Sequence, residues 1–465
     1  MLKRLFIHYI ADEARPMLRL AIPLVLAELG WMTMAIVDTM MVGRQANSAE
    51  AIGAVSLGSI LFNAVAIFGA GLMLGLDSVI PHAFGAGDVE DCHRSLVNGI
   101  YLAIVATPIL MGVIFGVEPL LRHMDIDPGV LNQAIPYLRT LNWSILPLMF
   151  YFVFRRYLQG MNIAKPIVFA LLSANLVNLV GNWALVYGHL GFHAMGTVGS
   201  GWSTLCARIY MASVLMVAAL YYDHRNKSGL RNAARVPNFP RVWRLVSLGF
   251  PSAVQFAIEV GVFAVTTMLI ARLGPVILAS HQIALNTVSL TYMVPLGISA
   301  AAAVRVGQAL GRKDPHGASR AGWTAILIGT AFMGCMAVLL FTIPRLIARA
   351  YTADPEVVRA TAGLPFVAAF FQLFDGMQTV ATGALRGSGD TRTPMICHLF
   401  FYWVVGLPVG ALLCFRYGWG AAGLWVGLSL ALILIGLALL YFWHRREKQF
   451  PTLPPPVETT GTLLH

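Results

Sequence analysis

Residues 22–44 read IPLVLAELGWMTMAIVDTMMVGR, and residues 250–272 read FPSAVQFAIEVGVFAVTTMLIAR. Each stretch is apolar over the length that a helix needs to cross the hydrocarbon core of a bilayer. Aligned with each other, the two stretches match Pro23 to Pro251 and Arg44 to Arg272. The chain therefore has membrane-spanning helices, and its second half repeats its first at an offset of about 227 residues.

Two further pairs of segments support this repeat. HAFGAGD (82–88) aligns with QALGRKD (308–314), and LQGMNIAKP (158–166) aligns with LRGSGDTRTP (385–394). Each half holds six predicted spans, so equivalent helices run through the membrane in the same direction. A parallel repeat about an axis along the membrane normal is typical of transporters, with a cavity expected between the halves.

The composition of the 465 residues excludes a water-soluble protein. Hydrophobic residues make up 58% of the chain and charged residues only 11%, and the mean hydropathy is +0.72. So few charges could not cover the surface of a soluble domain of this size. The five cysteines have no paired spacing, and we interpret them as packing residues rather than as disulfides or metal ligands. No cleavable signal peptide is predicted.

The apolar runs predict an all-α polytopic protein with twelve transmembrane helices in two pseudosymmetric six-helix lobes. The first six spans are predicted near 16–42, 54–81, 95–117, 131–158, 164–187 and 196–222. The second six are predicted near 245–271, 277–309, 320–343, 357–385, 392–415 and 420–443.

The distribution of basic residues predicts the topology. About 23 of the 32 Lys and Arg residues fall on the side that carries both termini, which places the termini in the cytoplasm. The net charge of +11 is therefore a topology signal, and no nucleic-acid partner is expected. The expected domains are an N-terminal lobe (1–222), a basic cytoplasmic linker (223–244), a C-terminal lobe (245–445) and a disordered cytoplasmic tail (446–465).

Several charged residues lie inside the predicted spans, where a carboxylate costs about 2.5–3.5 kcal/mol or more. In the first half, Asp38 lies in the outer part of span one. Asn178 and Asn182 are four residues apart on span five, hence on one helical face, and Thr204 enters from the outer end of span six. These four side chains can converge, and their oxygens suit a small cation such as Na⁺ or a proton. The alternative is a polar cluster that only joins helices.

In the second half, Glu259 and Asp375 are expected at nearly the same depth. Two carboxylates in a low-dielectric cavity favour the capture of a proton or a cation. The alternative is an acid satisfied by a neighbour such as Gln255 or Gln282. In the repeat these two acids and Asp38 align with uncharged residues, so symmetry does not require them.

Two other charged residues are weaker candidates or left open. Glu28 lies deeper on span one than Asp38, and Arg208 could pair with an acid or extend toward the membrane surface. His82, His281 and His398 are interpreted as packing or hydrogen-bonding residues. No phosphate-binding loop, GxSxG elbow or HExxH pair occurs, so we expect neither an enzyme nor a cofactor.

The sequence resembles the multidrug and toxic compound extrusion (MATE) transporters, in particular their NorM-type bacterial branch. The resemblance runs from about Met17 to about Arg445. In the first half it rests on VDTMMVG around Asp38, NLVGNWALVYG from Asn178 and GTVGSGWST ending at Thr204. In the second half it rests on LGFPSAVQFAIEVGVFAV, SHQIALN, RVGQALG and FQLFDGMQTVATGALRGSGDT.

This resemblance implies export of lipophilic organic cations, such as drugs and dyes, in exchange for Na⁺ or H⁺. The family's cation site carries over to Asp38, Asn178, Asn182 and Thr204, and its second-lobe acids to Glu259 and Asp375. Phe371 stands where the NorM branch can have a tyrosine, so this chain lacks that hydroxyl near the second-lobe site.

The expected protein is a monomer in the bacterial inner membrane that needs no cofactor and moves its lobes alternately. Two other functions are considered. One is a flippase or exporter of a lipid-linked or neutral metabolite with related architecture, which would need a cavity lined by basic residues. The other is a membrane-embedded transferase or protease, which would need a nucleophile and a base that the sequence does not offer.

Overall fold

The computed structural model describes residues 2–44, 48–123, 126–230, 236–352 and 354–450, and within these ranges it is helical with no strand. The predicted disordered tail falls mainly on residues 451–465, which lie outside the described residues. The first eight helices are α1 (Leu2–Val42), α2 (Ser48–Met73), α3 (Leu76–Gly85), α4 (Val89–Leu121), α5 (Pro128–Asn142), α6 (Ile145–Gly160), α7 (Lys165–Tyr187) and α8 (Gly196–Asn226).

The second half of the chain is built in the same way. Its α-helices are α9 (Phe239–Ala271), α10 (Pro275–Gly311), α11 (Pro315–Thr342), α12 (Pro344–Tyr351), α13 (Pro355–Gly387), α14 (Arg392–His398), α15 (Leu407–Ala411) and α16 (Gly420–Glu447). Two π-helical segments, η2 (Leu399–Gly406) and η3 (Leu412–Arg416), interrupt the helix that follows α13. Short π segments inside α-helices are frequent at functional sites.

Ten segments among the described residues are long and apolar enough to cross a membrane. They account for ten of the twelve predicted spans. The fourth predicted span, 131–158, is divided near Trp143 into α5 and α6, neither of which is long enough to cross alone. The tenth predicted span corresponds to α13, a continuous helix of 33 residues.

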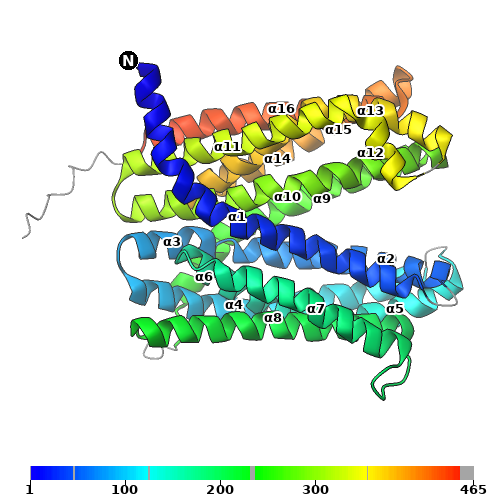
Figure 1. Cartoon of the computed structure of the whole chain (residues 1–465), viewed down its shortest axis with the longest axis horizontal. Helices are drawn as coiled ribbons and strands as arrows, with labels where there is room; N and C mark the ends of the chain where they lie inside the picture. Colours follow the sequence, from blue (N-terminus) through cyan, green and yellow to red (C-terminus); the bar gives the residue numbers. More distant parts are fainter. Residues whose placement is uncertain (1, 45–47, 124–125, 231–235, 353, 451–465) are drawn as a thin grey trace, which may run out of the picture.

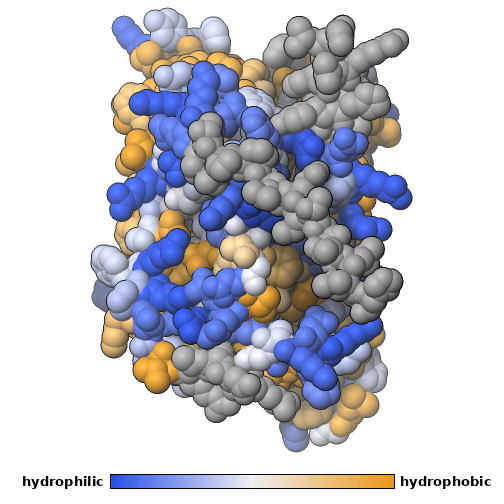
Figure 2. Space-filling model, turned by 90° about the vertical axis from the view of Figure 1, so that its left-hand side faces the viewer, coloured by the Kyte–Doolittle hydropathy of each residue, from blue (hydrophilic) through white to orange (hydrophobic). Residues whose placement is uncertain are grey.

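Figure 1 shows the helices in two lobes that lie side by side, with α2–α8 in one and α9–α16 in the other. α1 begins beside the second lobe and crosses into the first. The first residues of α1 and the last of α16 lie at the same end of the molecule, on the left of the view. We call this the terminal end, and the opposite one the far end. The terminal end seen face-on in Figure 2 is rich in hydrophilic residues.

The two lobes contact each other closely toward the terminal end. α1 and α3 pack against α10, and α2 packs against α9. A Cβ atom added to Gly249 of α9 would lie 1.9 Å from the carbonyl oxygen of Leu72 on α2, so only glycine allows this approach. Hydrogen bonds accompany the packing: Gln308 Nε2 donates to the carbonyl of Gly160 at 2.8 Å, and Asn162 Nδ2 donates to Gln308 Oε1 at 3.1 Å.

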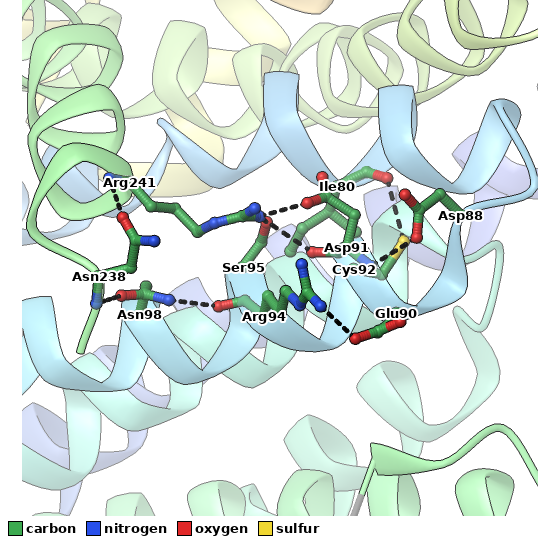
Figure 3. Close-up of polar contacts among 10 residues, drawn as sticks. All are labelled: Ile80, Asp88, Glu90, Asp91, Cys92, Arg94, Ser95, Asn98, Asn238 and Arg241. Atoms are coloured by element: carbon green, nitrogen blue, oxygen red, sulfur yellow. Dashed lines mark hydrogen bonds and ion pairs between the residues drawn. The ribbon is translucent and has the colours of Figure 1, made fainter. Parts of the chain in front are cut away.

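Hydrogen bonds and an ion pair hold the start of α9 against α4 at the terminal end (Figure 3). Asn98 Oδ1 accepts a hydrogen bond from the backbone N–H of Asn238 at 2.8 Å. Arg241 forms an ion pair with Asp91 at 2.6 Å and donates to the hydroxyl of Ser95 at 3.1 Å. Part of the basic linker predicted over 223–244 is therefore helical and attached to the first lobe.

Candidate functional site

A buried carboxylate and three neutral polar side chains meet in the first lobe. Asn182 Nδ2 donates to Asp38 Oδ1 at 2.6 Å, and the Thr204 hydroxyl donates to Asp38 Oδ2 at 3.0 Å. Asn182 Nδ2 also lies 3.3 Å from Asn178 Oδ1. None of the four side chains is more than 6% exposed. The structure thus brings together the four residues that the sequence grouped, from α1, α7 and α8.

The local sequence of α7 explains why its two amides point inward. Asn178 and Asn182 are fully buried, whereas Leu179 and Trp183, one residue further along, are 41% and 42% exposed on the other face of the helix. Gly181 lets α8 approach, because a Cβ atom there would lie 2.5 Å from the Ser203 hydroxyl. That hydroxyl donates to the backbone carbonyl of Asn178 at 2.7 Å and fixes α7 against α8.

Asp38 forms no ion pair within the part of the chain that the structure describes. Its hydrogen-bond donors are neutral, and no Lys, Arg or His nitrogen lies within 4.0 Å of it. Asn182 Oδ1 is buried and accepts no hydrogen bond from a described residue. A carboxylate beside amide and hydroxyl oxygens offers the hard ligands that a small cation prefers, while a proton would bind the carboxylate directly. The residues present therefore fit either ion.

The second-lobe acids lie on α9 and α13. Asp375 is 5% exposed and accepts a hydrogen bond from Gln378 Nε2 at 3.2 Å. Gln378 Oε1 lies 2.9 Å from Nε2 of the buried His398. Glu259 is half-buried, and Asp375 acts on it electrostatically. Neither acid forms an ion pair with any residue that the structure describes, so both remain available to a cation.

Two tyrosines near the second-lobe acids were not predicted from the sequence. The acids Glu259 and Asp375 act electrostatically on the side chains of Tyr292 and Tyr402. Tyr402 lies in the π-helical segment η2, and its buried hydroxyl has no hydrogen-bond partner among the described residues. Phe371 instead packs its ring against Trp425, with centroids 5.8 Å apart, and contributes no polar group.

The weaker candidates are placed differently. Glu28 forms an ion pair with Arg155 of α6, so its charge is already neutralised. Gln282 is exposed and forms no hydrogen bond with a described residue, whereas Gln255 is buried on α9. Sequence reasoning missed Arg155 as a partner, although a charged residue inside the predicted fourth span was a signal that could have found it.

A model of the MatE family matches the chain twice, over residues 23–184 and 251–412. The two matches begin at Pro23 and Pro251, the prolines that the internal repeat aligns, and together they cover more than half of the chain. The chain belongs to the MatE family. MATE proteins are membrane transporters rather than enzymes, and this one is a multi-pass membrane protein.

Individual MATE relatives are similar in sequence to this protein over almost the whole chain. A probable multidrug resistance protein NorM of Mesorhizobium japonicum is 37% identical over 95% of this chain and 96% of its own length. The multidrug resistance protein NorM of Photobacterium profundum is 32% identical over 93% of this chain and 96% of its own length. The resemblance to the NorM-type branch is thereby confirmed.

Solved structures show the same MATE fold at lower sequence identity. The eukaryotic MATE transporter AtDTX14 matches with a TM-score of 0.84 and 20% identity, over 95% of this chain and 98% of that one. A MATE protein in complex with MaD3S matches with a TM-score of 0.84 and 19% identity, over 94% of this chain and 96% of that one. The predicted fold class, two helical lobes of a MATE transporter, is confirmed.

Proposed function

We propose that this protein is a secondary active antiporter that exports lipophilic organic cations in exchange for Na⁺ or H⁺. The observation that carries the proposal is that Asp38, buried in the first lobe, accepts hydrogen bonds from neutral donors only and forms no ion pair with a described residue. Burying a carboxylate without an ion-pair partner is unfavourable, so a mobile cation that reaches it binds favourably. The names of the NorM relatives, which are multidrug resistance proteins, support small-molecule drugs as substrates.

The second-lobe acids would hold the charged group of the organic substrate or a second coupling cation. Glu259 and Asp375 would repel each other when both are ionised, and neither has a basic partner among the described residues. An organic cation between the lobes would relieve that repulsion while its apolar body is removed from water. The Asp38 cluster lies in the other lobe. The coupling cation could therefore bind in the first lobe and the organic cation in the second.

Exchange requires the two lobes to open alternately. The present closure at the terminal end, which we place on the cytoplasmic side, corresponds to a state closed to the cytoplasm. The lobes would open to the outside, release the organic cation as Na⁺ or H⁺ binds the carboxylates, and return to collect the next substrate. Coupling further requires that each ligand binds the two states with different affinity, because equal affinity shifts no population.

We further propose that the protein acts as a monomer in the inner membrane of a bacterium, with both termini in the cytoplasm. The lipid bilayer and small-molecule organic cations are its only proposed partners, and no cofactor takes part in the cycle. The basic residues concentrated at the terminal end support this orientation.

The purified protein in liposomes loaded with ethidium tests the proposal. Inward Na⁺ and pH gradients should be imposed separately, without a membrane potential, and dye movement recorded. We expect at least one gradient to drive ethidium against its own concentration gradient. Movement only down the dye gradient, with no response to either ion, would rule out antiport.

A further inference from the structure

Arg208 is a buried arginine that forms no ion pair with any described acid. It lies on α8, four residues after Thr204, and is 6% exposed. Its Nη1 donates to the hydroxyl of Ser144, and its guanidinium carbon lies 4.4 Å from the centroid of the Phe62 ring. Its Nε is buried without a hydrogen-bond partner among the described residues.

The other arginines buried in the membrane region are held differently. Arg155 pairs with Glu28, and both Arg156 and Arg386 pair with Asp77. Desolvation makes an unpaired buried cation costly, so a pairing of this kind is the ordinary solution. Arg208 departs from it, since no carboxylate oxygen of a described residue lies within 4.0 Å of its nitrogens.

The electrostatic surroundings of Arg208 connect it with the first-lobe cluster. The ionisable groups that act on its charge are Asp38 and Tyr137. Tyr137 shares a hydrogen bond of 3.1 Å with Ser59 and is an uncharged phenol at neutral pH. Thr204 connects the two charges structurally, because it donates to Asp38 and lies one helical turn from Arg208 on the same face of α8.

We propose that Arg208 is a fixed countercharge of the Asp38 site, which stabilises the ion-free carboxylate and keeps cation affinity low enough for release. The inference rests on the proposed function. With Arg208 present, its positive charge offsets part of the negative charge of the ion-free carboxylate. Without Arg208 that negative charge is not offset, so a bound Na⁺ or proton is held more tightly.

The anchors of Arg208 explain why it does not simply occupy the site itself. The Ser144 hydroxyl donates to the carbonyl of Leu141 and is thereby oriented to accept from Arg208. The Phe62 ring supplies a cation–π contact that holds the guanidinium. The charge therefore acts on Asp38 through space, and its removal should change cation affinity by about tenfold at the effective dielectric of partly buried pairs.

The test compares wild type, Arg208→Gln and Arg208→Lys. Cation affinity is measured in detergent as the rise in thermal stability with added NaCl and, separately, with falling pH. Turnover is measured as cation-driven ethidium export from liposomes. For Arg208→Gln we expect a half-maximal cation concentration about tenfold lower than in wild type, with a lower maximal rate because release is slowed. Arg208→Lys keeps the charge and should stay within about threefold of wild type.

Two outcomes would overturn the proposal: an unchanged half-maximal concentration in folded Arg208→Gln, or equal effects of Gln and Lys, which would show a role in packing only. If Arg208→Gln does not fold, Arg208→Met replaces it, because it removes the charge but keeps an apolar side chain against the Phe62 ring. Arg208→Met should lower the half-maximal cation concentration in the same way, and no change would contradict the proposal. If neither the thermal stability nor the ethidium export of wild type responded to Na⁺ or pH, the proposed function would be contradicted instead.

Discussion

Asp77 Oδ2 lies 3.5 Å from Nε of Arg386, and this ion pair connects the two lobes. The same oxygen lies 3.3 Å from Nη1 of Arg156 in its own lobe. Next to it, the Ser78 hydroxyl donates to the carbonyl of Arg386 at 2.6 Å. The side chains are buried at the terminal end, where the lobes are closed. Opening this end must separate Asp77 from Arg386 but can leave its pair with Arg156 intact.

We therefore predict that Asp77→Asn favours opening of the terminal end. Two arginines lose their buried countercharge, and breaking such a pair costs about 3–5 kcal/mol. Cysteines introduced at Asn162 and Gln308, in a background without the native cysteines, report closure through a short bismaleimide cross-linker.

Cross-linking between these positions should fall several-fold in Asp77→Asn. Glu90→Gln is the matched control, because it removes an exposed pair with Arg94 that does not join the lobes. Equal cross-linking in all three proteins would show that Asp77 does not hold the lobes together.

A second prediction concerns Glu28, which we assign to structure. Glu28→Gln leaves the guanidinium of Arg155 buried and unpaired, so thermal stability should drop by an amount that corresponds to about 3 kcal/mol or more. Asp38→Asn breaks no ion pair among the described residues and should therefore cost much less stability than Glu28→Gln. Thermal unfolding of both variants in the same detergent checks this contrast. A larger loss of stability in Asp38→Asn than in Glu28→Gln would reverse the two assignments.

A third prediction separates two asparagines on α7. Asn182→Ala removes a buried carbonyl oxygen that a metal cation could use as a ligand, so the half-maximal Na⁺ concentration should rise about tenfold, which corresponds to about 1.4 kcal/mol. The same change removes a hydrogen bond that stabilises the ionised carboxylate of Asp38, so the half-maximal proton concentration should instead fall.

Asn175→Ala is the matched control on the same helix. Its amide donates to the carbonyls of Gly30 and Leu171, away from the carboxylate. It should leave the cation dependence of dye export unchanged. Similar shifts in the two variants would mean that α7 matters only through its packing.

The repeat could be predicted because equivalent segments of the two halves have similar sequences, which a comparison of the chain with itself reveals. Pro23 and Pro251 open equivalent spans, and the family model matches begin at these residues. The Asp38 cluster was also predictable, since helical periodicity places Asn178 and Asn182 on one face and depth places Asp38 and Thr204 at their level. All four residues do make contact in the structure.

Pairings between distant residues were not predictable in this way. Glu28 and Arg155 are 127 positions apart, and Asp77 and Arg386 come from different lobes, so no local pattern relates them. Hydropathy likewise did not reveal the division of the fourth span near Trp143, because the residues on both sides of it are apolar. A single sequence predicts how deep a residue lies in the membrane and on which face of its helix. Which charged residues form ion pairs depends on how the helices and lobes pack.

Gradient-driven ethidium export by Asp38→Asn, reconstituted at the same density and orientation as wild type, tests the central claim most directly. Asparagine keeps the size of the side chain and its hydrogen-bonding capacity but carries no charge for a cation to neutralise. We predict that Na⁺- or pH-driven export falls to the rate of protein-free liposomes while the variant remains folded. Export at the wild-type rate, still coupled to the ion gradient, would contradict the claim that a cation moves through this carboxylate.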